Sequence, residues 1–137
     1  MVGVDGSESS VGALEWAAAQ ATLTGASLEV VATWEYPTSV GWAPAWPPDW
    51  DPAAEARAGL EKMIVRALGS DPDVKVKLNV LEGNPGQILV KAAEKAALLV
   101  VGSRGHGEFA GLLLGSVCEF CASHAQCPVV IYHRKPA

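Results

Sequence analysis

The stretch from Leu98 to Val117 places a buried strand directly before a glycine-rich loop and the start of a helix. Leu98 to Val101 are apolar residues in a row, which is typical of a strand covered on both faces of a parallel sheet. The loop that follows contains several glycines, namely Gly102, Gly105, Gly107, Gly111 and Gly115. Ser116 then opens a segment without Gly or Pro, so the loop leads into a helix N-terminus. Free N–H groups and the positive end of the helix dipole favour an anion there, and a phosphate group is the simplest candidate.

The spacing of these glycines differs from the two common phosphate-binding patterns. The sequence has no G-x-x-x-x-G-K-[ST], and Gly3 and Gly6, after the first predicted strand, do not form G-x-G-x-x-G. A P-loop NTPase and a dinucleotide-binding Rossmann protein are therefore both disfavoured. The alternative interpretation is that the glycines only mark turns.

Strand and helix patterns alternate along the whole chain. Apolar and β-branched runs predict strands at about 1–5, 27–34, 74–80, 98–101 and 128–133. Helical spacing of apolar residues predicts helices over about 7–24, 53–68, 84–96 and 116–125. A helix between every pair of strands requires a parallel sheet with right-handed crossovers and helices on both faces. We therefore expect one α/β domain over residues 1–137, which is long enough to bury a hydrophobic core.

Local signals support several of these boundaries. Ser7 is a candidate N-cap, and Asn84-Pro85-Gly86-Gln87 supplies an N-cap, a proline at the first helical position and a glutamine at N3. The segment 74–80 alternates apolar residues with lysines and an asparagine, which predicts a half-exposed strand at a sheet edge. The first strand is short, which suggests that the start of the chain is misassigned or trimmed. Asp5 follows that strand, and from the residues alone it reads as a turn or cap aspartate.

Residues 35–52 form a loop rich in proline and tryptophan. The segment EYPTSVGWAPAWPPDWDP includes Trp42, Trp46 and Trp50, and its prolines exclude regular secondary structure. Two interpretations have equal support. The loop is either an ordered aromatic lid or partner-facing patch, or its tryptophans pack on the surface of their own domain.

Composition narrows the classes of function. No apolar run approaches the roughly 18 residues that span a membrane, and the N-terminus lacks a signal-peptide pattern, so we expect a cytoplasmic protein without membrane contact. The 15 acidic residues against 10 basic ones give a net charge of −5, and the basic residues are scattered. This distribution disfavours a nucleic-acid partner.

The segments VVGSRGHG and LLLGSV, with the spacing Gly102-x2-Gly105-x9-Gly115-Ser116, resemble the nucleotide-binding signature of the universal stress protein family. The resemblance covers almost the whole chain, from VGVDGSESS to PVVIY. It implies a doubly wound, Rossmann-like sheet of five strands in the order 3-2-1-4-5. Ligands of such sheets bind beyond the carboxyl ends, where the strand order reverses. Asp5 and Gly102 would then face one another across one crevice.

The resemblance to ATP-binding members of the family also implies a set of ligand contacts. The adenosine would contact Val4, Asp5 and Thr33. The ribose and the phosphates would be surrounded by Gly102, Arg104 and Gly105. The phosphate tail would contact Gly115, Ser116, Val117 and Cys118. Cys118 departs from the family pattern, which has Ser or Thr there, and a thiol is a weak donor to a phosphate.

The cysteines allow three interpretations. Cys118 and Cys121 form C-x-x-C, with Cys127 and His124 nearby, which could be counted as a zinc site. A redox dithiol at a helix N-terminus is a second option, because the helix dipole lowers the pKa of a thiol. The favoured interpretation is three reduced thiols packed as small hydrophobic side chains. His106 is likewise favoured as a loop residue over a catalytic base.

The sequence therefore predicts a regulatory module of the stress response that binds ATP, or ADP or AMP, with Mg²⁺ as an accompanying ion. The glycine loop has no lysine and no residue placed to activate water, which favours holding a nucleotide over consuming it. Two alternatives are a nucleotide-free dimeric scaffold and a slow ATP hydrolase. A response-regulator receiver is disfavoured, because Asp5 lacks an acidic neighbour. The resemblance further implies a homodimer paired through the C-terminal strand and an unknown regulatory protein partner.

Overall fold

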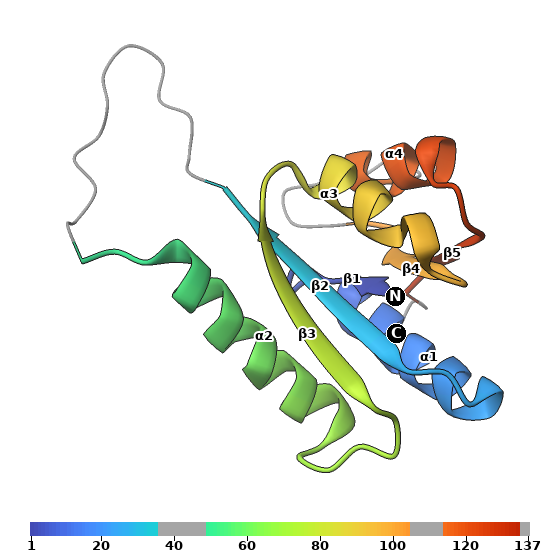
Figure 1. Ribbon diagram of the computed structural model, residues 1–137, viewed down its shortest axis with the longest axis horizontal. Helices are drawn as coiled ribbons and strands as arrows, with labels where there is room; N and C mark the ends of the chain where they lie inside the picture. Colours follow the sequence, from blue (N-terminus) through green and yellow to red (C-terminus); the bar gives the residue numbers. More distant parts are fainter. Residues whose placement is uncertain (36–48, 105–113, 135–137) are drawn as a thin grey trace.

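The structure of the protein is a computed structural model, and it describes residues 1–35, 49–104 and 114–134. Strands and helices alternate along the chain as expected (Figure 1). The elements are β1 (Val2–Gly3), α1 (Glu8–Thr24), β2 (Leu28–Trp34), α2 (Pro52–Leu68), β3 (Val76–Glu82), α3 (Pro85–Ala92), the 3-10 helix η1 (Ala93–Lys95), β4 (Leu99–Gly102), α4 (Ser116–His124) and β5 (Val129–Tyr132). None of the described helices has the length and hydrophobicity needed to cross a bilayer.

The five strands form one parallel sheet in the order β3-β2-β1-β4-β5. The predicted fold class and strand order are therefore confirmed. β1 lies at the centre, where Val2 pairs with Val30 of β2 on one side and with Val100 of β4 on the other. The order reverses at β1, because the chain first adds strands on its β2 side and then crosses to its β4 side. The carboxyl end of β1 is thus the switch point of the sheet.

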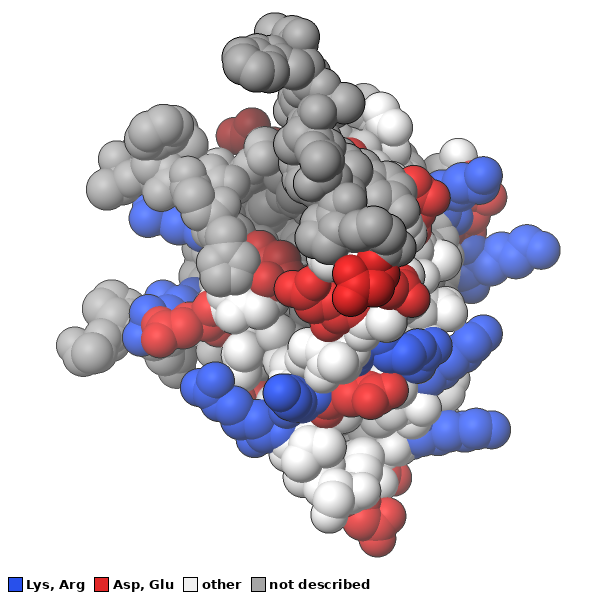
Figure 2. Space-filling model, turned by 90° about the vertical axis from the view of Figure 1, so that its left-hand side faces the viewer, with Lys and Arg blue, Asp and Glu red and all other residues white. Residues whose placement is uncertain are grey.

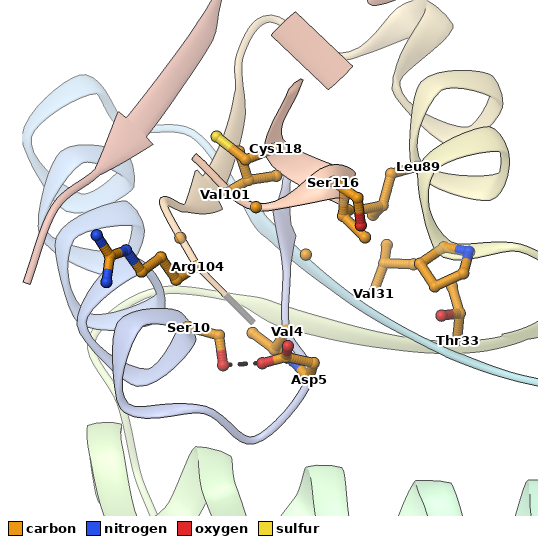
Figure 3. A pocket seen from close by; sticks show the side chains of 15 residues that line it. Val4, Asp5, Ser10, Val31, Thr33, Leu89, Val101, Arg104, Ser116 and Cys118 are labelled. Atoms are coloured by element: carbon orange, nitrogen blue, oxygen red, sulfur yellow. Dashed lines mark hydrogen bonds between the residues drawn. The ribbon is translucent and has the colours of Figure 1, made fainter. Parts of the chain in front are cut away.

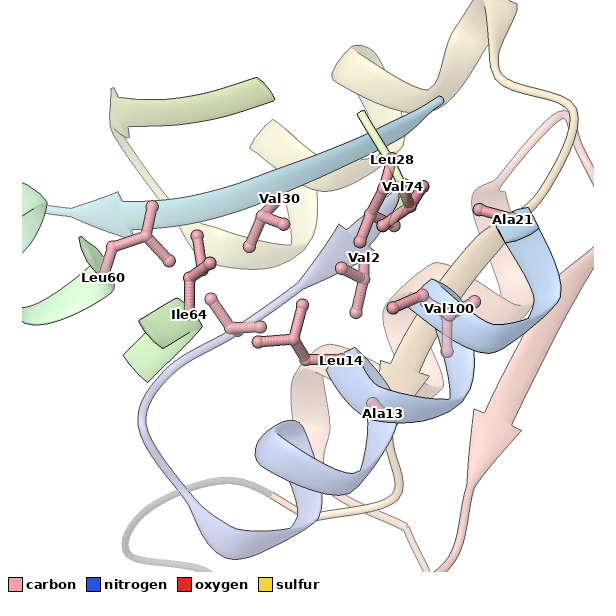
Figure 4. Close-up of a cluster of buried hydrophobic side chains, with 13 residues drawn as sticks. Val2, Ala13, Leu14, Ala21, Leu28, Val30, Leu60, Ile64, Val74 and Val100 are labelled. Atoms are coloured by element: carbon pink, nitrogen blue, oxygen red, sulfur yellow. The ribbon is translucent and has the colours of Figure 1, made fainter. Parts of the chain in front are cut away.

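Helices cover both faces of the sheet and enclose two hydrophobic cores. α1 and α2 pack on one face, and Leu14, Leu60 and Ile64 from these helices meet Val30 and Val100 from the strands (Figure 4). α3, η1 and α4 cover the other face, where their buried side chains, Leu89, Ala93, Cys118 and Cys121, pack on alternate residues of the same strands. A sheet buried on both faces explains the continuous apolar runs of β2 and β4.

Two strands, β1 and β3, differ from the prediction by two residues at one end or more, and the other three differ by one residue. β3 was expected over about 74–80, but it spans Val76–Glu82, because all seven of its residues pair with β2, from Leu28 opposite Val76 to Trp34 opposite Glu82. β1 has two residues in place of the expected five. Its ladder is extended on both sides by single bonds: the Val4 N–H donates to the Val31 carbonyl (2.9 Å), and the Met1 carbonyl accepts from the Val100 N–H (2.8 Å).

The α1 core supplies much of the stability of this fold. Leu14 is fully buried between α1 and the sheet, whereas Leu23 on the same helix is 82% exposed. We expect Leu14→Ala to lower the free energy of unfolding by about 2–5 kcal/mol, because it removes buried methyl groups and leaves a cavity. Leu23→Ala is the matched control and should change it by less than about 0.5 kcal/mol. Urea unfolding followed by circular dichroism measures both, and equal losses would contradict this assignment of the core.

Candidate functional site

A cavity of about 300 Å³ opens at the carboxyl ends of β1, β2 and β4, at the switch point of the sheet (Figure 3). Its walls come from the strand ends, from the start of α3 and from the first turn of α4. The lining residues are Gly3, Val4, Asp5, Ser10, Val31, Thr33, Pro85, Leu89, Val101, Gly102, Arg104, Gly115, Ser116, Val117 and Cys118.

The structure brings nine of the ten predicted site residues to this one cavity. Asp5 and Gly102 both line it, Asp5 just after β1 and Gly102 at the end of β4. Gly105, the tenth, lies outside the described residues, as do His106 and two of the loop tryptophans, Trp42 and Trp46. Residues far apart in the sequence therefore converge where a sheet of this topology binds ligands.

Asp5 serves the turn into α1 as well as the cavity. Its Oδ1 accepts a hydrogen bond from the Ser7 N–H (2.9 Å), and its own N–H donates to Ser10 Oγ (3.3 Å) (Figure 3). Ser7 in turn is the N-cap of α1, and its Oγ accepts from the Ser10 N–H (3.2 Å). The sequence-based interpretation of Asp5 as a turn aspartate and its placement in the crevice are therefore both correct. The turn holds the carboxylate at the cavity wall.

The N-terminus of α4 is the clearest anion-binding feature of the cavity. Its N-cap is Gly115, which offers no side-chain cap, whereas each of the other α-helices is capped by a side chain: Ser7, Asp51 or Asn84. The first intrahelical bond runs from the Glu119 N–H to the Gly115 carbonyl (2.9 Å). The N–H groups of residues 116–118 precede that bond, so they point out of the helix end toward the cavity. They can bind an anion there.

The end of the glycine loop is fixed to the strands. The Gly115 N–H donates to the Ser103 carbonyl (2.7 Å), and the Ser103 N–H donates to the Tyr132 carbonyl (2.8 Å). Gly102 has a packing reason for being glycine, because an added Cβ would lie 2.5 Å from Ser9 Oγ and 2.9 Å from the Ser9 carbonyl carbon. The absence of a side chain at Gly102 thus lets the start of α1 approach the end of β4.

Arg104 belongs to the cavity wall, but its guanidinium group does not point into the cavity. The side chain is exposed, and its guanidinium group points away from Ser116, Thr33 and Leu89 in Figure 3. The Arg104 carbonyl accepts a hydrogen bond from Ser7 Oγ (3.4 Å). The expected contact between Arg104 and a phosphate is therefore not preformed in this conformation.

Sequence reasoning missed several residues of the wall: Gly3, Ser10, Val31, Pro85, Leu89 and Val101. Two of them carried a readable signal. Val31 lies two residues before Thr33 on β2, and strand periodicity puts both on one face. Leu89 was predicted to face the core, and it closes the cavity from α3. Ser10 had no such signal, because it reaches the wall only through the turn that Ser7 and Asp5 form.

The three cysteines are free thiols. Burial raises the pKa of the Cys121 thiol to about 11, and the neighbouring Cys118 and Cys127 add to this shift. Burial also raises the pKa of Cys118, with a contribution from the Glu119 carboxylate. Loss of solvent thus outweighs any lowering of the thiol pKa by the helix dipole, which disfavours the redox dithiol that the sequence left open. Within the described residues, no group of three or more His, Cys, Asp or Glu side chains is placed to hold a metal ion.

A parallel sheet with a cavity at its switch point, beside an uncapped helix N-terminus, defines a class of α/β binding proteins. The model of the universal stress protein family matches residues 1–133. The chain belongs to this family.

Similar proteins agree with that assignment. A universal stress protein from Mycolicibacterium smegmatis is 36% identical over 132 residues, an alignment that covers 96% of this chain and 44% of that protein. A universal stress protein from Mycobacterium tuberculosis is 35% identical over 135 residues, and the alignment covers 96% of this chain and 43% of that protein. The chain thus spans a little under half the length of these curated relatives. A crystal structure of a universal stress protein in complex with cAMP is 30% identical, with a TM-score of 0.71 and coverage of 96% of this chain and 93% of that one.

The thiol environments predict an order of chemical reactivity. Cys127 is partly exposed, whereas Cys118 and Cys121 are buried and have raised pKa values. The thiolate is the nucleophile, so a raised pKa lowers the reactive fraction at pH 8. Brief exposure to iodoacetamide at pH 8, followed by peptide mass spectrometry, should label Cys127 at least about tenfold more than Cys121. Labelling of Cys121 should increase as the pH approaches 11, and preferential labelling of Cys121 at pH 8 would contradict the structure.

Proposed function

We propose that this chain binds an adenine nucleotide in the cavity at the switch point and acts as a regulatory module of the stress response. ATP was the ligand expected from the sequence, with ADP and AMP as shorter forms. The observation that carries the proposal is the uncapped N-terminus of α4 at one wall of the cavity, opposite the Asp5 carboxylate at the other. The helix N-terminus suits the anionic group of a nucleotide, and the carboxylate suits the hydrogen-bond donors of its sugar or base.

The lining suggests how such a ligand lies. The base fits against Val31, Thr33 and Leu89, because Val31 and Leu89 offer apolar surface there beside Thr33. Asp5 then faces the sugar or the base edge, where a carboxylate can accept hydrogen bonds from hydroxyl or amino groups. The phosphate meets the N–H groups and the Ser116 hydroxyl at the start of α4.

The comparison with the cAMP complex supports an adenine nucleotide. That protein shares 30% of its sequence and nearly the whole fold with this chain. Transfer of the ligand class is a proposal for this chain, and so are ATP as the particular ligand and Mg²⁺ as its companion. Since the described side chains form no cage for a metal, the oxygens of the phosphates would have to supply most of the ligands of such an ion.

The cavity favours binding over hydrolysis. The carboxylate among its described lining residues is Asp5, and one oxygen of Asp5 already accepts from the Ser7 N–H. A hydrolase would need a base positioned on the attacking water. The nucleotide-free scaffold remains the alternative, and a direct binding measurement separates it from the proposal. A cytoplasmic location and an unknown regulatory protein partner stay predictions from the sequence.

The α4 N-terminus provides the sharpest test of nucleotide binding. Gly115→Asp places a carboxylate at the N-cap, where it can accept from the N–H groups of the first turn and stabilise the helix. The same carboxylate occupies the anion site and repels a phosphate. We expect AMP affinity, measured by isothermal titration calorimetry, to fall by at least about tenfold while the unfolding temperature stays equal or rises.

Gly115→Asn is the matched control for that experiment. It supplies a similar cap without the negative charge, so its loss of affinity should be smaller than that of Gly115→Asp. Equal AMP binding by wild type and Gly115→Asp would refute the placement of the phosphate at α4. No binding of any adenine nucleotide to the wild type would favour the scaffold.

We also propose a homodimer that pairs through β5. β5 is at one edge of the sheet, and its four residues, Val129–Tyr132, carry no charge. The carbonyls of Pro128 and Tyr132 accept bonds from the N–H groups of Leu99 in β4 and Ser103 just after it. Strand alternation therefore directs the backbone groups of Val129 and Ile131 to the open edge. An edge of this kind is a template for a second strand.

Light scattering after gel filtration tests the dimer. The wild type should have twice the chain mass of 14.2 kDa. Ile131→Pro removes an outward N–H and should shift the protein to the monomer, since proline cannot donate to a neighbouring strand. Ile131→Ala loses similar packing but keeps that N–H, so it should remain dimeric. A monomeric wild type would contradict the proposal.

A further inference from the structure

We propose that, without a divalent cation, the cavity selects an adenine nucleotide with a single phosphate group over one with a polyphosphate tail, so that binding of ATP depends on its Mg²⁺ companion. This inference rests on the proposed function, because it concerns the ligand of the same cavity. It is carried by the shortage of positive charge around the α4 N-terminus.

The described wall of the cavity contains one cationic residue, Arg104, and one carboxylate, Asp5. The guanidinium group of Arg104 is exposed and points away from the cavity, so its charge is screened by water (Figure 3). An anion in the cavity would therefore depend on backbone N–H groups and on the partial charge of the helix end. That partial charge is about half an elementary charge, which suits a ligand of low charge.

The sequence around the site adds negative charge and no further cation. From Leu98 to Cys127 the sequence has one arginine, Arg104, and no lysine. Glu119 lies in the first turn of α4. A carboxylate in that turn offsets the positive end of the helix dipole, so less of it is available to a bound anion. A second and third phosphate would find no positive side chain on α4 or on β4.

Charges of both signs lie on the end of the molecule where β2 finishes and α2 begins. Figure 2 looks at this end, and it shows acidic side chains near the middle with basic side chains on either side of them. This face therefore offers no uniformly positive surface that would attract a polyphosphate.

Charge and size point to the same class of ligand. A cyclic phosphodiester carries one negative charge, a phosphomonoester about 1.5 to 2 at neutral pH, and each further phosphate adds more. The cavity of about 300 Å³ is at the lower end of the roughly 300–1,000 Å³ typical of small-molecule sites. The expected order of affinity without a divalent cation is therefore cAMP, then AMP, then ADP, then ATP.

Calorimetric titration of the chain, freed of any co-purified nucleotide, tests this order with those four ligands in Mg²⁺-free buffer at low ionic strength. ATP should bind at least about tenfold more weakly than AMP. Raising the salt to about 0.15 M should narrow the gap, because the Debye length falls from about 30 Å at 0.01 M to about 8 Å. ATP binding as tightly as AMP would overturn the inference and leave the proposed function intact. Binding of none of the four would refute both.

A charge variant tests the physical cause. Glu119→Gln removes the carboxylate from the first turn of α4, so the ratio of the ATP to the AMP dissociation constant should fall by about twofold or more at low salt. Glu15→Gln makes the same change at an exposed position of α1 outside the cavity wall, and it should leave the ratio unchanged. An unchanged ratio in Glu119→Gln, or an equal change in both variants, would contradict the role of local charge.

Discussion

The double pairing of β1 is the interaction on which the site depends. Val2 joins β1 to β2 and to β4 at once, through Val30 and Val100. Because the chain leaves β1 through α1 toward β2 and later reaches β4 through α3 on the other side of β1, the strand order reverses at the carboxyl end of β1. The cavity opens at that point, and its two walls are held at a fixed separation by a strand of only two residues.

Serine side chains at the start of α1 hold the same strand ends together by hydrogen bonds. Three serines of this region bond to the ends of three strands: Ser10 Oγ accepts from the Asp5 N–H after β1, Ser7 Oγ donates to the Arg104 carbonyl after β4, and Ser9 Oγ donates to the Tyr132 carbonyl of β5 (3.5 Å). Each bond alone contributes modestly in water. Together they place the helix start, the turn of Asp5 and the entry to the glycine loop in one rigid unit.

The sequence predicted the fold well because its signals were local and mutually consistent. Strand and helix periods alternated, and two of the three side-chain caps, Ser7 and Asn84, were readable before the structure was known. The end of β3 was not readable, because its pairing with β2 continues to Glu82 after the alternation of side chains stops. The pKa of Cys121 was also beyond reach, since burial in the folded core, not position along the helix, determines it.

In this site the fold supplies the backbone N–H groups that bind an anion, and the side chains around them set the local charge. The N–H groups of α4 keep their donors whatever residue stands at 116–118, so a thiol at Cys118 does not abolish the anion site. Side chains around that site then decide how much charge it tolerates. A lysine near Gly115 would supply a full charge to a polyphosphate, whereas Glu119 reduces what the helix end supplies. Within one fold, the ligand can therefore change from a polyphosphate to a single phosphate without any change in the strands or helices that bind it.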